Sequence, residues 1–81
     1  MIFLFKVEET FQITGRGLIL TPGLGKNHAR VGNKIRLILP DKSFIDTKIM
    51  GVEFGNGFPI LVGSELKKGD VPADTEVWLY E

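Results

Sequence analysis

The sequence predicts an all-β fold, a small closed barrel of six antiparallel strands. Runs rich in β-branched and aromatic residues recur along the whole chain, and turns that contain glycine, proline or asparagine separate them. No window shows a convincing helical period of apolar residues, and the only helical candidate is a single turn around residues 64–68. The 81 residues have room for one domain, residues 1–81, and a closed barrel suits so small a chain because it leaves no exposed sheet edge.

The first strand is expected to run from Ile2 to Ile13. Alternation along it separates an apolar face from a polar one. The apolar face consists of Phe3, Phe5, Val7, Phe11 and Ile13. Glu9 also falls on this face, and a bend or β-bulge between Glu8 and Thr10 would resolve the conflict.

A glycine-flanked turn at Gly15-Arg16-Gly17 is expected to reverse the chain into the second strand, residues 18–20. Glycine adopts a positive φ without a steric clash, so this spacing is a β-hairpin signal. The strand should end at Thr21-Pro22-Gly23, because proline lacks the N–H that a ladder needs. A polar loop then leads to the third strand.

The remaining four strands are expected at residues 35–39, 44–54, 58–62 and 76–80. Residues 40–43 and the glycine-flanked residues 55–57 have the composition of turns. Pro59 indicates that its strand lies at an edge or only begins there. Residues 65–74 form a polar connection to the last strand.

The composition predicts a globular, cytoplasmic and soluble protein with no membrane partner. The chain has no cysteine, which fits a reducing compartment, and no stretch approaches the roughly 20 apolar residues that span a bilayer. Its formal net charge is zero, which argues against a protein that coats nucleic acid. Met1 and the strand-like ending indicate a complete domain, although a fragment of a larger factor would read the same way.

Charge is unevenly distributed along the chain. Residues 10–40 contain five basic residues and no acidic one. These basic residues are Arg16, Lys26, Arg30, Lys34 and Arg36. They form either a phosphate-facing patch or, as the simpler interpretation, solvated strand ends and loops.

Two nucleotide-binding motifs are incomplete in this sequence. Gly25-Lys26 stands in a glycine-rich loop, but Leu20 occupies the place of the first P-loop glycine and Asn27 that of the magnesium-binding Ser or Thr. Leu20 also stands where the dinucleotide fingerprint needs its third small residue. The chain is therefore not expected to be a GTPase by itself, nor to carry a cofactor.

Catalytic residues are equally scarce, so no enzymatic activity is expected. His28 is the only histidine, which excludes a multi-histidine metal centre and leaves Ser43 or Ser64 without a nucleophile context. Glu8 and Glu9 are neighbours that face opposite ways on a strand, so they do not form a proton-sharing pair unless a bulge reorients one.

The stretch from Glu8 to Gly17, followed by Thr21, resembles the start of the second domain of elongation factor Tu and related translational GTPases. The shared pattern is an acidic pair, a phenylalanine, Ile-Ser/Thr-Gly-Arg-Gly, a short apolar strand and a threonine. Similar later segments follow in the same order at residues 31–35, 51–54, 61–63 and 70–77. The resemblance covers most of the chain and implies a β-barrel of the translation-factor domain 2 kind.

In that family the barrel holds the aminoacylated 3′ adenosine of transfer RNA, and the resemblance implies an RNA-end site here. The walls of an amino-acid side-chain pocket would be Glu8, Glu9, Phe11 and Thr21. The apolar bed for the adenine would be Ile13, Gly15, Ile19 and Ile60. Glu53 would meet the ribose and base, and the backbone near Phe54 and Asn56 would meet the amino group.

The sequence departs from the family at three places. Only residues 55–57 join two strands that are more widely separated in the family, and Pro22 and Asp74 replace glycines. The GTPase and third domains that clamp transfer RNA in the family have no counterpart in these 81 residues.

Two alternatives follow. The motif could serve the fold alone, with Glu8 or Glu53 paired to Arg16 across strands. The barrel could also be an adaptor that docks on a GTPase, the ribosome or itself.

Overall fold

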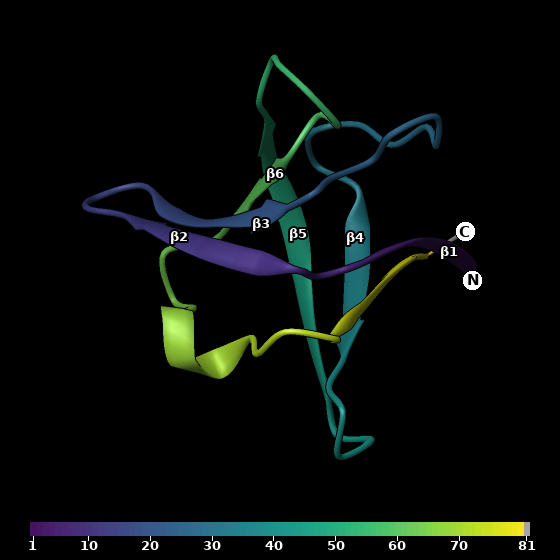
Figure 1. Cartoon of the computed structure of the whole chain (residues 1–81), viewed down its shortest axis with the longest axis vertical. Helices are drawn as coiled ribbons and strands as arrows, with labels where there is room; N and C mark the ends of the chain where they lie inside the picture. The colour runs from purple at the N-terminus through teal and green to yellow at the C-terminus, as the bar shows by residue number, and fades with distance from the viewer. Residues whose placement is uncertain (81) are drawn as a thin grey trace.

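The computed structural model describes residues 1–80, and in it seven strands form one antiparallel sheet with the order β1-β7-β4-β5-β6-β3-β2 (Figure 1). The elements are β1 (Ile2–Lys6), β2 (Glu9–Ile13), β3 (Gly17–Thr21), β4 (Lys34–Ile38), β5 (Phe44–Val52), β6 (Ile60–Val62), the 3-10 turn η1 (Lys68–Asp70) and β7 (Glu76–Leu79). The prediction of an all-β, antiparallel fold is confirmed.

The sheet curls because β5 pairs with different strands along its length. Its first part pairs with β4 and its last part with β6, and the register shifts between Ile49 and Gly51. We call β1, β7, β4 and residues 44–48 the first layer, and β2, β3, β6 and residues 49–52 the second layer. In Figure 1, β2 and β3 run across β4 and β5.

The prediction of a closed barrel with six strands was wrong. The expected first strand is divided, since β1 ends at Lys6 and β2 begins at Glu9, and these two strands lie at opposite ends of the sheet order without pairing with each other. Val7 N–H donates to the carbonyl of Thr75, whereas Glu8 N–H donates to that of Thr21, both at 2.8 Å. The chain changes partners within these two residues, and the result is a curled half-barrel.

The predicted faces of the first strand were also partly wrong. The β1–β7 register shifts between Phe3 and Phe5, so both Leu4 and Phe5 are buried while Phe3 is 43% exposed. Past the break, Thr10 is buried and Phe11 is 45% exposed. The bulge and the break each reset the alternation, which a simple count along the chain cannot follow.

The hydrophobic core lies between the two layers. Its members include Leu18 and Leu20 of β3, Ile35 and Leu37 of β4, Ile60 and Val62 of β6, and Val77 of β7. Ile19 and Leu61 are also buried, at 8% and 5% exposure, but they do not belong to this cluster. They lie on the opposite, outward face of the second layer.

The helical turn expected around residues 64–68 lies slightly later, at η1. The backbone N–H of Lys67 donates to Asp70 Oδ2 (2.9 Å), which closes the turn. Within residues 1–80, no helix has the length and apolar character that a membrane crossing requires.

Candidate functional site

The outward face of the second layer carries a row of residues that crosses four strands. Phe11 of β2 lies opposite Ile19 of β3, Ile19 lies opposite Leu61 of β6, and Leu61 lies opposite Gly51 of β5. Residues paired in this way project from the same side of a sheet. We call this row the outward row. At one end the Phe11 ring is 45% exposed, and at the other end Gly51 contributes no side chain.

Glu53 closes the glycine end of the outward row. A Cβ built on Gly51 would lie 3.5 Å from Leu61 Cβ and 3.9 Å from Glu53 Oε2, so the carboxylate stands beside the notch that Gly51 leaves. Arg16 Nη2 lies 3.9 Å from the same oxygen. Both side chains are well exposed, so this ion pair contributes at most about 1 kcal/mol and is easily exchanged for another partner. Of the two carboxylates expected as partners of Arg16, Glu8 and Glu53, the structure shows the pair with Glu53.

Thr21 and the acidic pair lie at the other end of β3. Thr21 is the cross-strand partner of Glu9, and its hydroxyl donates to the Glu9 carbonyl oxygen (2.9 Å). The side chains of Glu8 and Glu9 are exposed. The four expected pocket-wall residues are therefore near one another along β2 and β3, but the Thr21 hydroxyl already has a backbone partner.

The structure changes the predicted adenine bed. Ile60 was assigned to it wrongly: Ile60 pairs with Leu20 and is fully buried in the core, and Leu61 takes its place on the outward face. Ile19 is on the correct face but is largely covered. Ile13 is half-buried opposite Gly17.

The turn residues of the predicted site project into solvent. Gly15 is exposed at the β2–β3 turn, Asn56 is exposed in the β5–β6 loop, and Phe54 is 96% exposed. Phe11 and Phe54 are therefore the two rings of the predicted site, and both are accessible.

Sequence reasoning missed a cation beside the outward row. Lys68 Nζ lies 5.8 Å from the centre of the Phe11 ring, and the Lys68 backbone N–H donates to Gln12 Oε1 (3.2 Å). A positive charge over a ring is attracted to its π electrons. Nothing in the local sequence pairs η1 with a strand 56 residues away, so only the fold shows this contact.

The five basic residues predicted as one patch are spread over different parts of the surface. Lys26 lines a hollow of about 300 Å³ with His28, and Arg30 lines a neighbouring one. Arg16 belongs to the outward row's border, as described above. Lys34 and Arg36 project from β4 on the outward face of the first layer, because Ile35 and Leu37 between them are buried.

No protein-family model matches the chain. The assignment of a function therefore depends on the residues that the fold gathers. Within residues 1–80, no group of three or more His, Cys, Asp or Glu side chains is placed to hold a metal ion.

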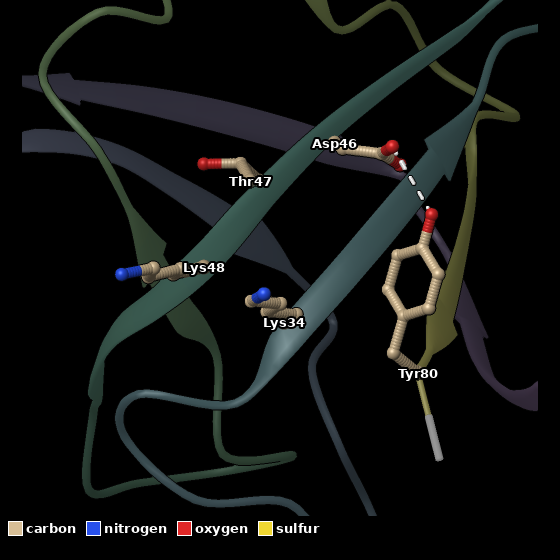
Figure 2. A pocket seen from close by; sticks show the side chains of 5 residues that line it. All are labelled: Lys34, Asp46, Thr47, Lys48 and Tyr80. Carbon is tan, nitrogen blue, oxygen red and sulfur yellow. Dashed lines mark hydrogen bonds between the residues drawn. The ribbon is translucent and has the colours of Figure 1, made fainter.

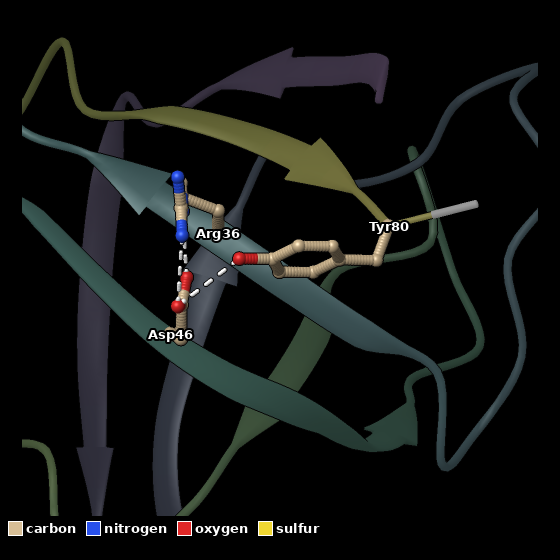
Figure 3. A network of polar contacts seen from close by, with 3 residues as sticks. All are labelled: Arg36, Asp46 and Tyr80. Atoms are coloured by element: carbon tan, nitrogen blue, oxygen red, sulfur yellow. Dashed lines mark hydrogen bonds and ion pairs between the residues drawn. The ribbon is translucent and has the colours of Figure 1, made fainter.

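Arg36 belongs to a polar network on the first layer (Figure 3). Its Nε and Nη2 donate to the two carboxylate oxygens of Asp46 at 2.8 and 3.0 Å, and the Tyr80 hydroxyl donates to Asp46 Oδ2 at 3.1 Å. The guanidinium also stacks 3.8 Å above the Phe44 ring. Arg36 is therefore committed to partners within the chain.

The network shifts the acid–base properties of its members. The hydrogen bond from Arg36, with a further one from Tyr80, holds the pKa of Asp46 below its usual value, and the same bond raises the pKa of Arg36. Partial burial and the bond to Asp46 raise the pKa of Tyr80.

We expect Arg36→Gln to raise the pKa of Asp46 towards its ordinary value and Tyr80→Phe to raise it less, because the Arg36 hydrogen bond is the larger cause. Carbon-detected NMR titration of the carboxyl groups measures both. The folded-state pKa lies below the unfolded one, so the network stabilises the fold above the unfolded pKa of about 3.9 and this contribution is lost as the pH falls through the folded value.

Asp41 is the internal control for this titration. Its pKa is lowered by the hydroxyl and backbone N–H of Ser43, not by the network. It should titrate alike in both variants; a change at Asp41 equal to that at Asp46 would contradict the prediction.

Proposed function

We propose that the chain is a non-enzymatic binding module whose outward row receives the aminoacylated 3′-terminal adenosine of a transfer RNA, or another RNA 3′ end. The fold is proposed to be of the translation-factor domain 2 kind, which the sequence resembles. The observation that supports this most is the juxtaposition of an exposed ring, an apolar strip, a glycine notch and a carboxylate across four strands.

Each part of the outward row suits a part of the ligand. An unstacked base packs on aromatic and apolar side chains, and here Phe11 supplies the accessible surface because Ile19 and Leu61 are largely covered. The Glu53 carboxylate accepts hydrogen bonds from the ribose hydroxyls. To accept them, Glu53 gives up its ion pair with Arg16, which is exposed and therefore costs little free energy to break.

The test is a titration of isotope-labelled protein with a stable 3′-aminoacylamido analogue of adenosine. Amide signals of Phe11, Thr21 and Glu53 should shift, and Phe11→Ala should weaken binding about tenfold, because a stacking contact contributes about 1–3 kcal/mol. Val31→Ala is the control: Val31 is 62% exposed in the loop before β4, outside the outward row, and its loss should change nothing. Absence of shifts at millimolar analogue contradicts the proposal.

One observation favours the alternative of an adaptor that docks on a GTPase, the ribosome or a second copy. Phe54 is almost fully exposed on a loop whose far end is fixed, since Leu24 N–H and Gly25 N–H donate to the carbonyls of Phe58 (3.0 Å) and Gly57 (2.9 Å). Such a ring resembles the aromatic anchors of protein interfaces. Under this alternative the adenosine analogue produces no shift and Phe54, not Phe11, carries the interaction.

A further inference from the structure

The outward face of the first layer carries planar groups that the core does not use. Phe3 lies opposite Trp78, and Trp78 lies opposite Arg36. The Phe3 and Trp78 rings meet edge to face with their centres 5.3 Å apart, and the Arg36 guanidinium lies 3.8 Å from the centre of the Phe44 ring and 5.3 Å from that of the Tyr80 ring. Rings and guanidinium together form a broad surface for stacking, which we call the aromatic face.

Two lysines border the aromatic face in an arrangement that the sheet itself does not favour. Lys34 and Lys48 are direct cross-strand partners on β4 and β5, and both are exposed. Like charges in this position destabilise a sheet. An anionic ligand between them would remove the repulsion.

A hollow of about 600 Å³ lies at these lysines (Figure 2). Its lining residues are Lys34, Asp46, Thr47, Lys48 and Tyr80. Figure 2 shows both lysines projecting from neighbouring strands with the Tyr80 ring to one side. Asp46, the carboxylate in this set, already accepts two hydrogen bonds from Arg36, and Thr47 donates to Glu65 Oε1 (3.0 Å), so Lys34 and Lys48 are the charged lining groups that face an anion beside the Tyr80 ring.

Further along the aromatic face the charges are balanced. Glu76 accepts a hydrogen bond from Trp78 Nε1 (2.9 Å) and lies opposite Lys6. The positive excess is therefore concentrated at Lys34 and Lys48.

We propose that the aromatic face binds a single-stranded nucleic acid, with bases on the Tyr80, Trp78 and Phe44 rings and phosphates at Lys34 and Lys48. This ligand presents flat faces and negative charges at close intervals, so it matches both features of the surface. In RNA-recognition motifs, exposed aromatic residues on a four-stranded sheet stack two or three bases. The site is on a different layer from the outward row and does not depend on the function proposed for that row.

Trp78 provides a direct measurement, because it is the chain's only tryptophan and lies within the aromatic face. A twelve-residue oligouridylate or oligothymidylate should quench its fluorescence and raise the anisotropy of an end-labelled strand. Neutralising both lysines in Lys34→Gln/Lys48→Gln should weaken binding at least tenfold at low salt. It should also reduce the slope of log affinity against log salt by about 1.4, about 0.7 for each lost phosphate contact.

The control separates this site from general charge. Lys26→Gln/Arg30→Gln removes the same charge from the loop between β3 and β4 and should leave oligonucleotide binding unchanged. Removal of two opposed lysines should leave the thermal midpoint unchanged or higher, so lost binding does not reflect unfolding.

Three results would overturn the proposal. The first is a loss in the loop variant equal to that in the Lys34/Lys48 variant. The second is oligonucleotide binding without quenching of Trp78. The third is equal affinity for heparin, which carries charge but no bases. Binding to RNA but not DNA, or to both, supports the site and identifies the sugar that it accepts.

Discussion

Gly17→Ala should destabilise the fold by about 2–6 kcal/mol, the sum of about 1–3 for an unfavourable backbone conformation and about 1–3 for overpacking. Gly17 has φ +139°, which L side chains rarely adopt, and a Cβ there would overlap the carbonyl oxygen of Val62 on β6. The whole fold is worth only about 4–12 kcal/mol at 0.05–0.15 per residue, so this one methyl group removes much of it.

Gly15→Ala is the matched control in the same turn. Gly15 also has a positive φ, +78°, but nothing lies within 4 Å of a Cβ built there, so the loss should be only about 1–2 kcal/mol. Urea unfolding followed by Trp78 fluorescence measures both variants. Equal losses would show that backbone conformation, and not the approach of β3 to β6, requires Gly17.

This contrast bears on the Gly-Arg-Gly motif. Its second glycine is explained by its positive φ and by packing between strands, whereas Arg16 between the two glycines reaches Glu53 on the outward face. One short motif therefore serves both the fold and the candidate site.

Local signals in the sequence were sufficient for the fold class. Period-two alternation and glycine or proline turns depend on neighbouring residues, and they located each hairpin; the break of β3 at Pro22 and the late start of β6 after Pro59 follow from the missing proline N–H. The division of the first strand was not predictable in the same way. It depends on Val7 and Glu8 finding partners on two distant strands.

The predictions for the candidate site also differ between residues placed by local pairing and residues placed by long-range pairing. Phe11, Ile19 and Thr21, which the resemblance assigned to the site, share one face because β2 and β3 form a local hairpin whose turn fixes the register. Ile60 was placed wrongly because the β3–β6 register is set by long-range pairing, and a shift of one residue exchanges the two faces. Lys68 was missed because η1 approaches β2 only in the folded chain.

Leu20→Ala should cost about 2–5 kcal/mol, whereas Ile19→Ala, the adjacent residue on β3, should cost only about 1–2 kcal/mol. Leu20 is fully buried between the layers, where its removal leaves a cavity that the closely packed core cannot fill. Ile19 lies between Phe11 and Leu61 on the outward face, where the 45% exposed Phe11 ring can move in, so chiefly the transfer free energy is lost.

The same urea titration measures the free energy of unfolding of both variants. A titration with the adenosine analogue then tests how well the folded Ile19→Ala protein binds. Ile19→Ala should stay folded and bind the analogue less well, because its side chain supports the Phe11 ring across the hairpin. A loss of stability equal to that of Leu20→Ala would place Ile19 in the core. The outward row would then be a continuation of the packed interior, and the second layer would offer a ligand no apolar surface independent of the fold.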